Sequence, residues 1–156
     1  MEEKTKKQAS ERKIKILKEK NSSGNIIVVI RIKGEVKVKP GVKFTLDKLR
    51  LRRKYSCILI NSSNTSLLGM LKKVRFAVAY GNIDTETLVA LLKARGQKID
   101  GKNFNSDEAA IELINGKKLD ELGFKPFFRL HPPRGGINSK LQYPKGVLGN
   151  NKENIN

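Results

Sequence analysis

The stretch NIIVVIRIK, residues 25–33, has the clearest strand pattern in the chain. Successive side chains of a strand point to opposite faces, so every second residue shares one surface. One of these surfaces is entirely apolar and comprises Ile26, Val28, Ile30 and Ile32. The other surface begins apolar and becomes basic at Arg31 and Lys33. We therefore expect a strand that is buried at its first end and emerges into solvent at its second end.

A helix, a second strand and a second helix are predicted next along the chain. Pro40 favours a helix start, because proline suits the first turn and apolar residues follow it at helical spacing. Residues 55–60 (YSCILI) predict the second strand. Asn64 or Thr65 is a candidate cap of the second helix, which we expect to end at Gly81. Its apolar stripe would comprise Leu67, Met70, Leu71, Val74 and Val78.

The second half of the chain predicts further helices and one last strand. Asp84 is a candidate N-cap of a third helix that stops at Gly96, and residues 106–114 fit a short helix ended by Gly116. Residues 127–131 predict the last strand. This order of elements indicates an α+β fold class. We expect the helices on one face of the sheet, with the other face left to pack on something external.

The composition points to a polyanionic partner. The chain has 33 Lys and Arg against 15 Asp and Glu, a formal net charge of +18 on 156 residues. Nucleic acid would relieve the resulting self-repulsion, and an anionic membrane surface is the competing interpretation. The longest apolar run, residues 26–30, is far too short to span a bilayer, and residues 1–20 lack the apolar region of a secretory signal. We expect a soluble intracellular protein.

Residues suited to catalysis or metal binding are scarce. His131 is the only histidine and Cys57 the only cysteine, which excludes a histidine pair, an intrachain disulfide and a cysteine-based zinc cluster. Cys57 lies within an apolar strand, where a small buried side chain is expected. We therefore predict no catalytic site, no cofactor and no metal. The alternative is a nucleic-acid-processing enzyme that holds a metal through Asp100, Asp107 or Asp120.

Basic residues gather in several short runs. Residues 49–54 (LRLRRK) place four cations in five positions at the end of a predicted helix. Solvation and the negative end of the helix dipole explain one such run, but repetition favours contact with phosphates. The other runs are Lys37/Lys39, Lys72/Lys73/Arg75, Lys117/Lys118 and Arg129/Arg134/Lys140. Since most of the few aromatic residues fall at core-like positions, we expect binding through charge and shape rather than base stacking.

The segment RLHPPRGG, residues 129–136, has two interpretations. Its prolines stiffen the chain, Arg134 offers a bidentate contact to a phosphate, and Gly135 and Gly136 allow a ligand to approach the backbone closely. A surface turn that follows the last strand explains the same composition equally well.

Three stretches together resemble the large-subunit ribosomal protein "L thirty" family, whose eukaryotic members are called "L seven". They are residues 30–42 (IRIKGEVKVKPGV), residues 49–81 (LRLRRKYSCILINSSNTSLLGMLKKVRFAVAYG) and residues 129–136. The last of these is similar to a hallmark of the archaeal and eukaryotic members. The resemblance extends over about residues 26–150, and it is to an archaeal-type member of the family.

The resemblance implies a fold and a domain division. The implied core is a ferredoxin-like β-α-β-α-β unit with a three-stranded antiparallel sheet, extra short helices and basic terminal tails. The chain would then consist of a basic N-terminal tail at residues 1–25, one core domain at residues 26–131 and a basic C-terminal extension at residues 132–156. Within the core domain, residues 97–125 would be a variable insertion.

The resemblance also implies a function. It is that of a structural constituent of the large ribosomal subunit in the cytoplasm, which binds large-subunit rRNA beside neighbouring ribosomal proteins and supports assembly. The alternative is a free-standing RNA-binding or regulatory module outside the ribosome. The positions that the motifs carry over as RNA-facing are Lys33, Arg52, Arg53, Lys72, Lys73, Arg129, His131, Arg134, Gly135 and Gly136.

Overall fold

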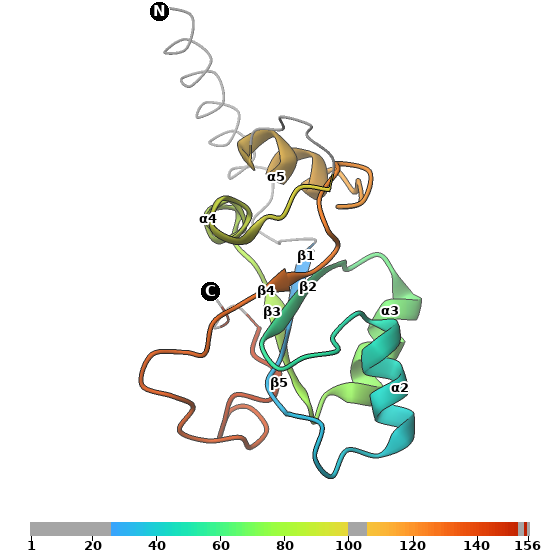
Figure 1. Cartoon of the computed structure of the whole chain (residues 1–156), viewed down its shortest axis with the longest axis vertical. Coiled ribbons are helices and arrows are strands. Elements are labelled where there is room, and N and C mark those ends of the chain that lie inside the picture. Colours follow the sequence, from blue (N-terminus) through green and yellow to red (C-terminus); the bar gives the residue numbers. More distant parts are fainter. Residues whose placement is uncertain (1–25, 100–105, 153–154, 156) are drawn as a thin grey trace, which may run out of the picture.

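The computed structural model describes residues 26–99, 106–152 and 155, so the predicted N-terminal tail lies outside the described residues. Within them, a five-stranded sheet has the strand order β4-β2-β1-β3-β5 (Figure 1). The strands are β1 (Ile26–Arg31), β2 (Ser56–Asn61), β3 (Val78–Asn82), β4 (Phe128–Arg129) and β5 (Gly149–Asn150). The helices are α2 (Pro40–Lys48), α3 (Thr65–Val74), α4 (Thr85–Arg95) and α5 (Ser106–Ile114).

The predicted α+β class is confirmed, but the sheet differs from the expected one. β1 is central and pairs antiparallel with β2 and with β3. β4 joins β2 antiparallel, whereas β5 joins β3 in parallel. The prediction of a three-stranded sheet is therefore wrong in strand number, whereas the predicted antiparallel pairing holds for every pair of strands except β3 and β5. Each outer strand has only two residues, which is too short to leave a periodic signal in the sequence.

The second predicted helix is wrong in its second half. α3 ends at Val74, and the chain turns at once into β3, with the Ala77 amide donating to the Val74 carbonyl at 2.8 Å. Val78 is buried in β3 opposite Arg31. Because Val74 and Val78 are four residues apart, their spacing also fits a helix. Only the long-range pairing of β3 with β1 selects the strand.

Gly81, the predicted helix end, lies within β3 instead. The C-terminal segment passes this strand so closely that a Cβ atom on Gly81 would collide with the Lys152 carbonyl oxygen. The Asn82 amide donates to the same oxygen at 2.9 Å. The glycine therefore serves a close approach of two backbones rather than the end of a helix.

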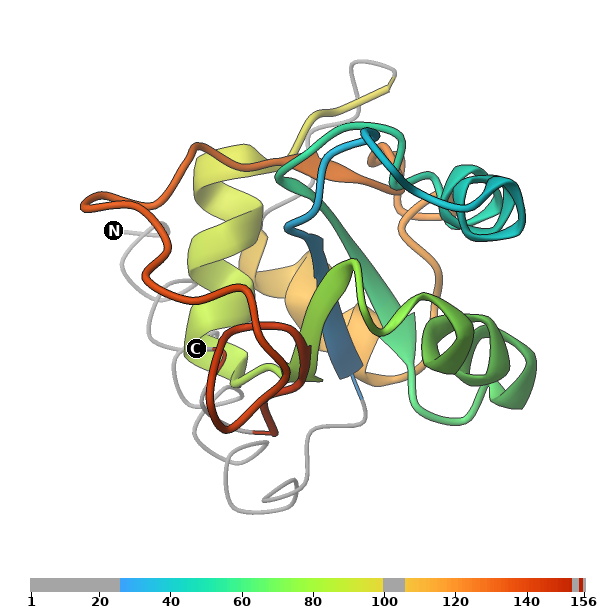
Figure 2. The ribbon, with the colours of Figure 1, turned by 90° about the horizontal axis from the view of Figure 1, so that it is seen from below.

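Helices cover both faces of the sheet, so the prediction of helices on one face is wrong. Val28 lies in a core cluster with Leu88 and Leu92 of α4, whereas Val29 lies in a second cluster with Leu46 of α2. Figure 2 shows the sheet between the α4/α5 layer and the α2/α3 layer. Alternating apolar residues on both sides of β1 require this two-sided burial.

The other predicted elements agree with the structure more closely. α4 begins after Asp84 at the N-cap position and ends at Gly96, and α5 has the predicted bounds. The last predicted strand is present but shorter, as β4. No helix among the described residues is long and apolar enough to cross a membrane.

Candidate nucleic-acid interface

One end of the sheet collects most of the predicted site residues. The Tyr55 amide donates to the Arg31 carbonyl at 2.8 Å, and the Leu130 amide donates to the Tyr55 carbonyl at 2.9 Å. The amides of Ile32 and Lys33 both donate to the Ala77 carbonyl at 3.0 Å. These bonds bring together the end of β1, the start of β2, the start of β3 and the end of β4.

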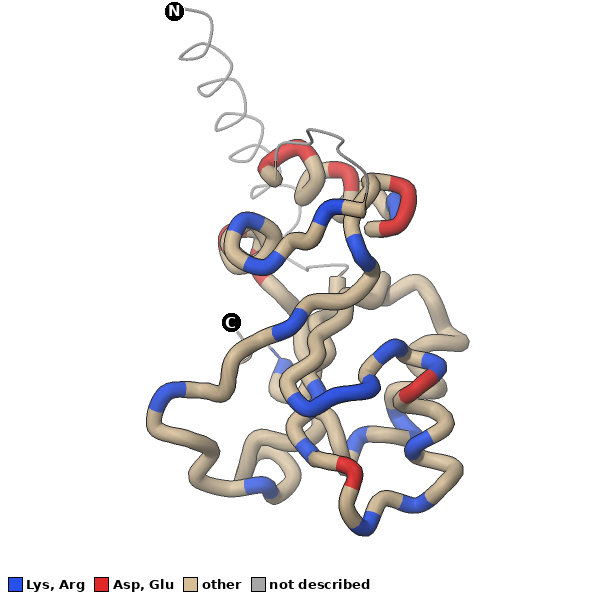
Figure 3. Tube along the Cα trace, in the orientation of Figure 1, with Lys and Arg blue, Asp and Glu red and all other residues tan. Residues whose placement is uncertain are grey.

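The side chains carried to this end form a basic surface. α3 ends directly before β3, so its last turn reaches the same end of the sheet. Figure 3 shows lysines and arginines spread over the lower half of the molecule, which includes this end of the sheet, and most of the acids around α4 and α5. We call the set the basic end, and its members are Lys33, Arg52, Arg53, Lys72, Lys73, Arg129 and His131, all of them exposed.

The remaining predicted site residues lie on a separate loop. Arg134, Gly135 and Gly136 follow β4 in a turn that is closed by the Gly136 amide donating to the Pro133 carbonyl at 3.1 Å. Both glycines have positive φ, 78° and 80°, which explains their residue type. Figures 1 and 2 show the segment between β4 and β5 running away from the α2/α3 layer. Among the described residues, no backbone hydrogen bond joins this turn to the basic end.

The loop between α2 and β2 has a defined conformation. We call residues 50–55 the basic loop. α2 ends in a Schellman motif, in which the Arg50 amide donates to the Asp47 carbonyl and the Leu51 amide to the Leu46 carbonyl, both at 2.9 Å. Arg50 has the left-handed φ of 59° that this motif requires, and Tyr55 at the other end of the loop has a φ of 62°. Leu51 is fully buried between them.

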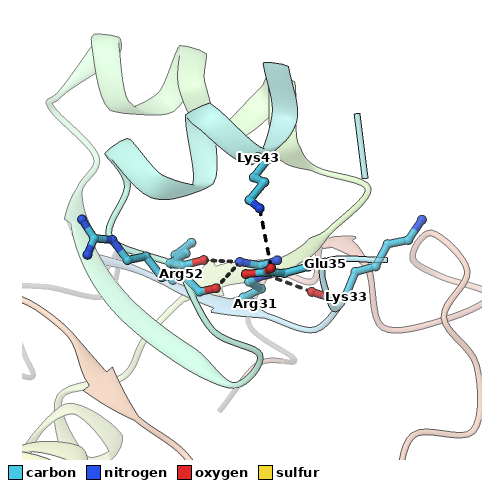
Figure 4. Close-up of polar contacts among 6 residues, drawn as sticks. Arg31, Lys33, Glu35, Lys43 and Arg52 are labelled. Atoms are coloured by element: carbon cyan, nitrogen blue, oxygen red, sulfur yellow. Dashed lines mark hydrogen bonds and ion pairs between the residues drawn. The ribbon is translucent and has the colours of Figure 1, made fainter. Parts of the chain in front are cut away.

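Arg31 is a residue of this region that the sequence pattern placed wrongly. The strand pattern predicted a side chain emerging into solvent, but Arg31 is only 1% exposed. Its guanidinium donates to the carbonyls of Leu51 and Arg52, on the basic loop (Figure 4). An arginine that ends an apolar strand gives no local sign of burial, because the acceptors that make burial possible come from twenty residues away.

The residues considered for an enzyme have other surroundings. Cys57 is fully buried, and burial raises the pKa of its thiol to about 12, so the reactive thiolate is absent at neutral pH. Asp107 pairs with Lys93 at 3.0 Å and Asp120 with Arg50 at 3.8 Å, whereas Asp100 lies outside the described residues. The described part of the chain holds no group of three or more such side chains that could bind a metal.

Comparisons with known proteins identify the family. A family model described as ribosomal protein L30p/L7e matches residues 27–78. The large ribosomal subunit protein uL30 of Archaeoglobus fulgidus is 39% identical to this chain over 147 residues, which cover 84% of this chain and 95% of the relative. The chain belongs to the L30p/L7e family of ribosomal proteins.

Other archaeal relatives extend the same result. The proteins of the same name from Desulfurococcus amylolyticus and Korarchaeum cryptofilum are 37% and 40% identical, covering 84% and 72% of this chain and 94% and 77% of the relatives. The predicted resemblance to an archaeal-type member is thereby confirmed. The L30p/L7e family is structural and not enzymatic, in agreement with the prediction of no catalytic activity.

Proposed function

We propose that this protein is a structural constituent of the large ribosomal subunit and that it binds large-subunit rRNA through the basic end. Its relatives over nearly their full length are large-subunit proteins. One observation supports the basic end as the binding surface: exposed cations from four separate segments lie at the same end of the sheet. Such an arrangement suits a ligand with several phosphates along a backbone.

The binding mechanism is neutralisation of phosphates by a preformed surface. Lys33, Arg52 and Arg53 project from loops at the end of the sheet, and Lys72 and Lys73 from the last turn of α3. Each phosphate neutralised releases condensed counterions, so affinity should fall steeply with salt. The turn at residues 133–136 supplies a second contact through Arg134, away from the basic end. Neighbouring ribosomal proteins would share the remaining surface.

Sedimentation of a cell lysate that expresses the tagged full chain tests this function. We expect the chain to migrate with the large subunit, near one copy per particle, and to remain there after a wash in moderate salt. Recovery at the top of the gradient would contradict the proposal and favour the free-standing RNA-binding module. Vesicles of anionic lipid serve as a control, and RNA should compete the chain off them because both bind by charge.

A further inference from the structure

Arg31 is a buried cation whose hydrogen bonds all go to backbone carbonyls. Its Nη1 donates to the carbonyls of Leu51 at 2.7 Å and Arg52 at 2.6 Å, and its Nε donates to that of Lys33 at 2.9 Å. Figure 4 shows the guanidinium lying between the two segments. Thus one side chain ties the end of β1 to the basic loop.

The charge of Arg31 has no carboxylate partner among the described residues. The nearby acid Glu35 pairs with Lys43 at 3.7 Å instead (Figure 4). One nitrogen of the guanidinium, Nη2, is buried and has no hydrogen-bond partner in the described part of the chain. A buried, unpaired cation is unfavourable for folding unless dipoles solvate it, which the carbonyls of Leu51 and Arg52 do here.

The basic loop needs such support, because its backbone is held in unfavourable conformations at both ends. Arg50 and Tyr55 have φ of 59° and 62°, in the left-handed region that residues other than glycine avoid. Leu51, fully buried, fixes the first half of the loop. Arg31 holds the next carbonyl, that of Arg52, the first of three consecutive exposed cations.

We propose that Arg31 is a positioning residue, which shapes the basic loop so that Arg52, Arg53 and Lys54 face RNA. Two effects follow from its hydrogen bonds. The carbonyls of Leu51 and Arg52 point inward, so these partial negative charges are withdrawn from the surface that meets phosphate. The loop is also ordered before binding, so less conformational entropy is lost in the complex. The effect on affinity rests on the proposed function, whereas the effect on loop order does not.

Nuclear magnetic resonance of the free protein tests the loop order directly. In the wild type we expect backbone order parameters near 0.85 for the amides of Arg52 and Arg53, as in rigid backbone. Arg31→Lys keeps the charge but loses the planar fork, so these values should fall to about 0.6 or below while those of β1 and β2 stay unchanged. Loop values below about 0.6 in the wild type would contradict the proposal without any variant.

A double-mutant cycle tests the link to RNA, with large-subunit rRNA of Archaeoglobus fulgidus as the probe at fixed salt. Arg31→Lys should weaken binding by about tenfold in the wild type but by less than about twofold when Arg52 and Arg53 are already alanine, because coupled residues are not additive. An equal loss in both backgrounds would overturn the positioning role. Absence of binding by the wild type would contradict the proposed function and leave the measured loop order as it stands.

Lys33→Ala provides a matched control for the same experiments. Lys33 is an exposed cation two residues from Arg31, and its carbonyl, not its side chain, bonds Arg31. Its removal should weaken RNA binding without changing the order parameters of the basic loop. If Lys33→Ala loosened the loop as much as Arg31→Lys does, loop order would depend on surface charge rather than on the buried guanidinium.

Discussion

The two helical layers are alike in architecture but differ in charge. Residues 26–82, which contain α2 and α3, carry 13 Lys and Arg against 2 Asp and Glu. Residues 83–128, which contain α4 and α5, carry 7 against 8. We call these the basic half and the balanced half. Residues 26–82 therefore contribute +11 (13 minus 2) to the net charge of +18, so the basic half is strongly positive and suited to a polyanion.

Ion pairing follows the same division. In the balanced half Lys93 pairs with Asp107 and Lys117 with Glu112, at 3.0 and 3.1 Å. Within the basic half, Lys43 and Glu35 form the one ion pair among described residues, and Arg50 pairs across to Asp120 of the balanced half. Cations that pair with no carboxylate remain available for phosphates, so we expect the basic half to be the layer that binds RNA.

The largest effect is expected from the double variant Arg52→Ala/Arg53→Ala. A hydrogen bond to a charged group contributes about 1.5 kcal/mol or more, so the loss of two should weaken rRNA binding on the order of 100-fold. The slope of log affinity against log salt should also fall by about 0.7–0.9 per lost contact. Filter binding over a salt series measures both quantities. Unchanged affinity at matched salt would remove these residues from the interface.

Cys57 provides a test of the core beneath the balanced half, because it packs with α4 and α5. Burial raises the pKa of its thiol from 9.0 to about 12, so between these pH values the unfolded chain loses a proton that the folded chain keeps. Stability should therefore decrease as pH rises through this window, by at most about 1.4 kcal/mol per pH unit.

Urea unfolding of the wild type and of Cys57→Ala from pH 8 to 10.5 isolates this contribution, since all other groups are shared. The free energy of unfolding of the wild type should fall relative to that of the variant by about 2 kcal/mol between pH 8 and pH 10.5. A difference that does not change with pH would show that the thiol is not held protonated by burial.

A lysine pair in each half makes a matched comparison. Lys72→Ala/Lys73→Ala at the end of α3 should weaken rRNA binding by about tenfold, because both lysines belong to the basic end. Lys117→Ala/Lys118→Ala after α5 removes the same charge from the other layer and should change affinity less than about twofold. Equal losses for both variants would show that rRNA affinity depends on the total charge and not on which half carries it.

The smallest effect concerns Arg50, which forms an ion pair with Asp120 between the two halves. Arg50→Gly relieves the left-handed backbone at the end of α2 and should raise stability by about 1 kcal/mol. The pair is exposed and its atoms are 3.8 Å apart, so its loss should cost little. Thermal unfolding measures the balance, and a lower melting temperature would mean that the pair outweighs the strain.

Local signals predicted a large part of this structure. α4 and α5 could be predicted because Asp84, Gly96 and Gly116 mark their boundaries in the sequence. β3 could not be predicted, because its five residues follow a helix and form a strand only through pairing with β1. Each residue of β3 pairs with a residue of β1 at least 47 positions earlier in the chain. The composition of the site was predictable, since phosphate binding needs exposed cations. The gathering of those cations depends on bonds such as that from Tyr55 to Arg31, which no local pattern contains.

Lysine footprinting of the assembled particle tests most directly whether the basic half faces rRNA. Acetylation of the tagged chain is measured by mass spectrometry in purified large subunits and in the free protein. We predict that Lys33, Lys72 and Lys73 become protected in the particle and regain reactivity after ribonuclease treatment, while Lys117 and Lys118 remain reactive or are protected in a ribonuclease-resistant way. Ribonuclease-sensitive protection of Lys117 and Lys118, with Lys33, Lys72 and Lys73 still reactive, would contradict the account.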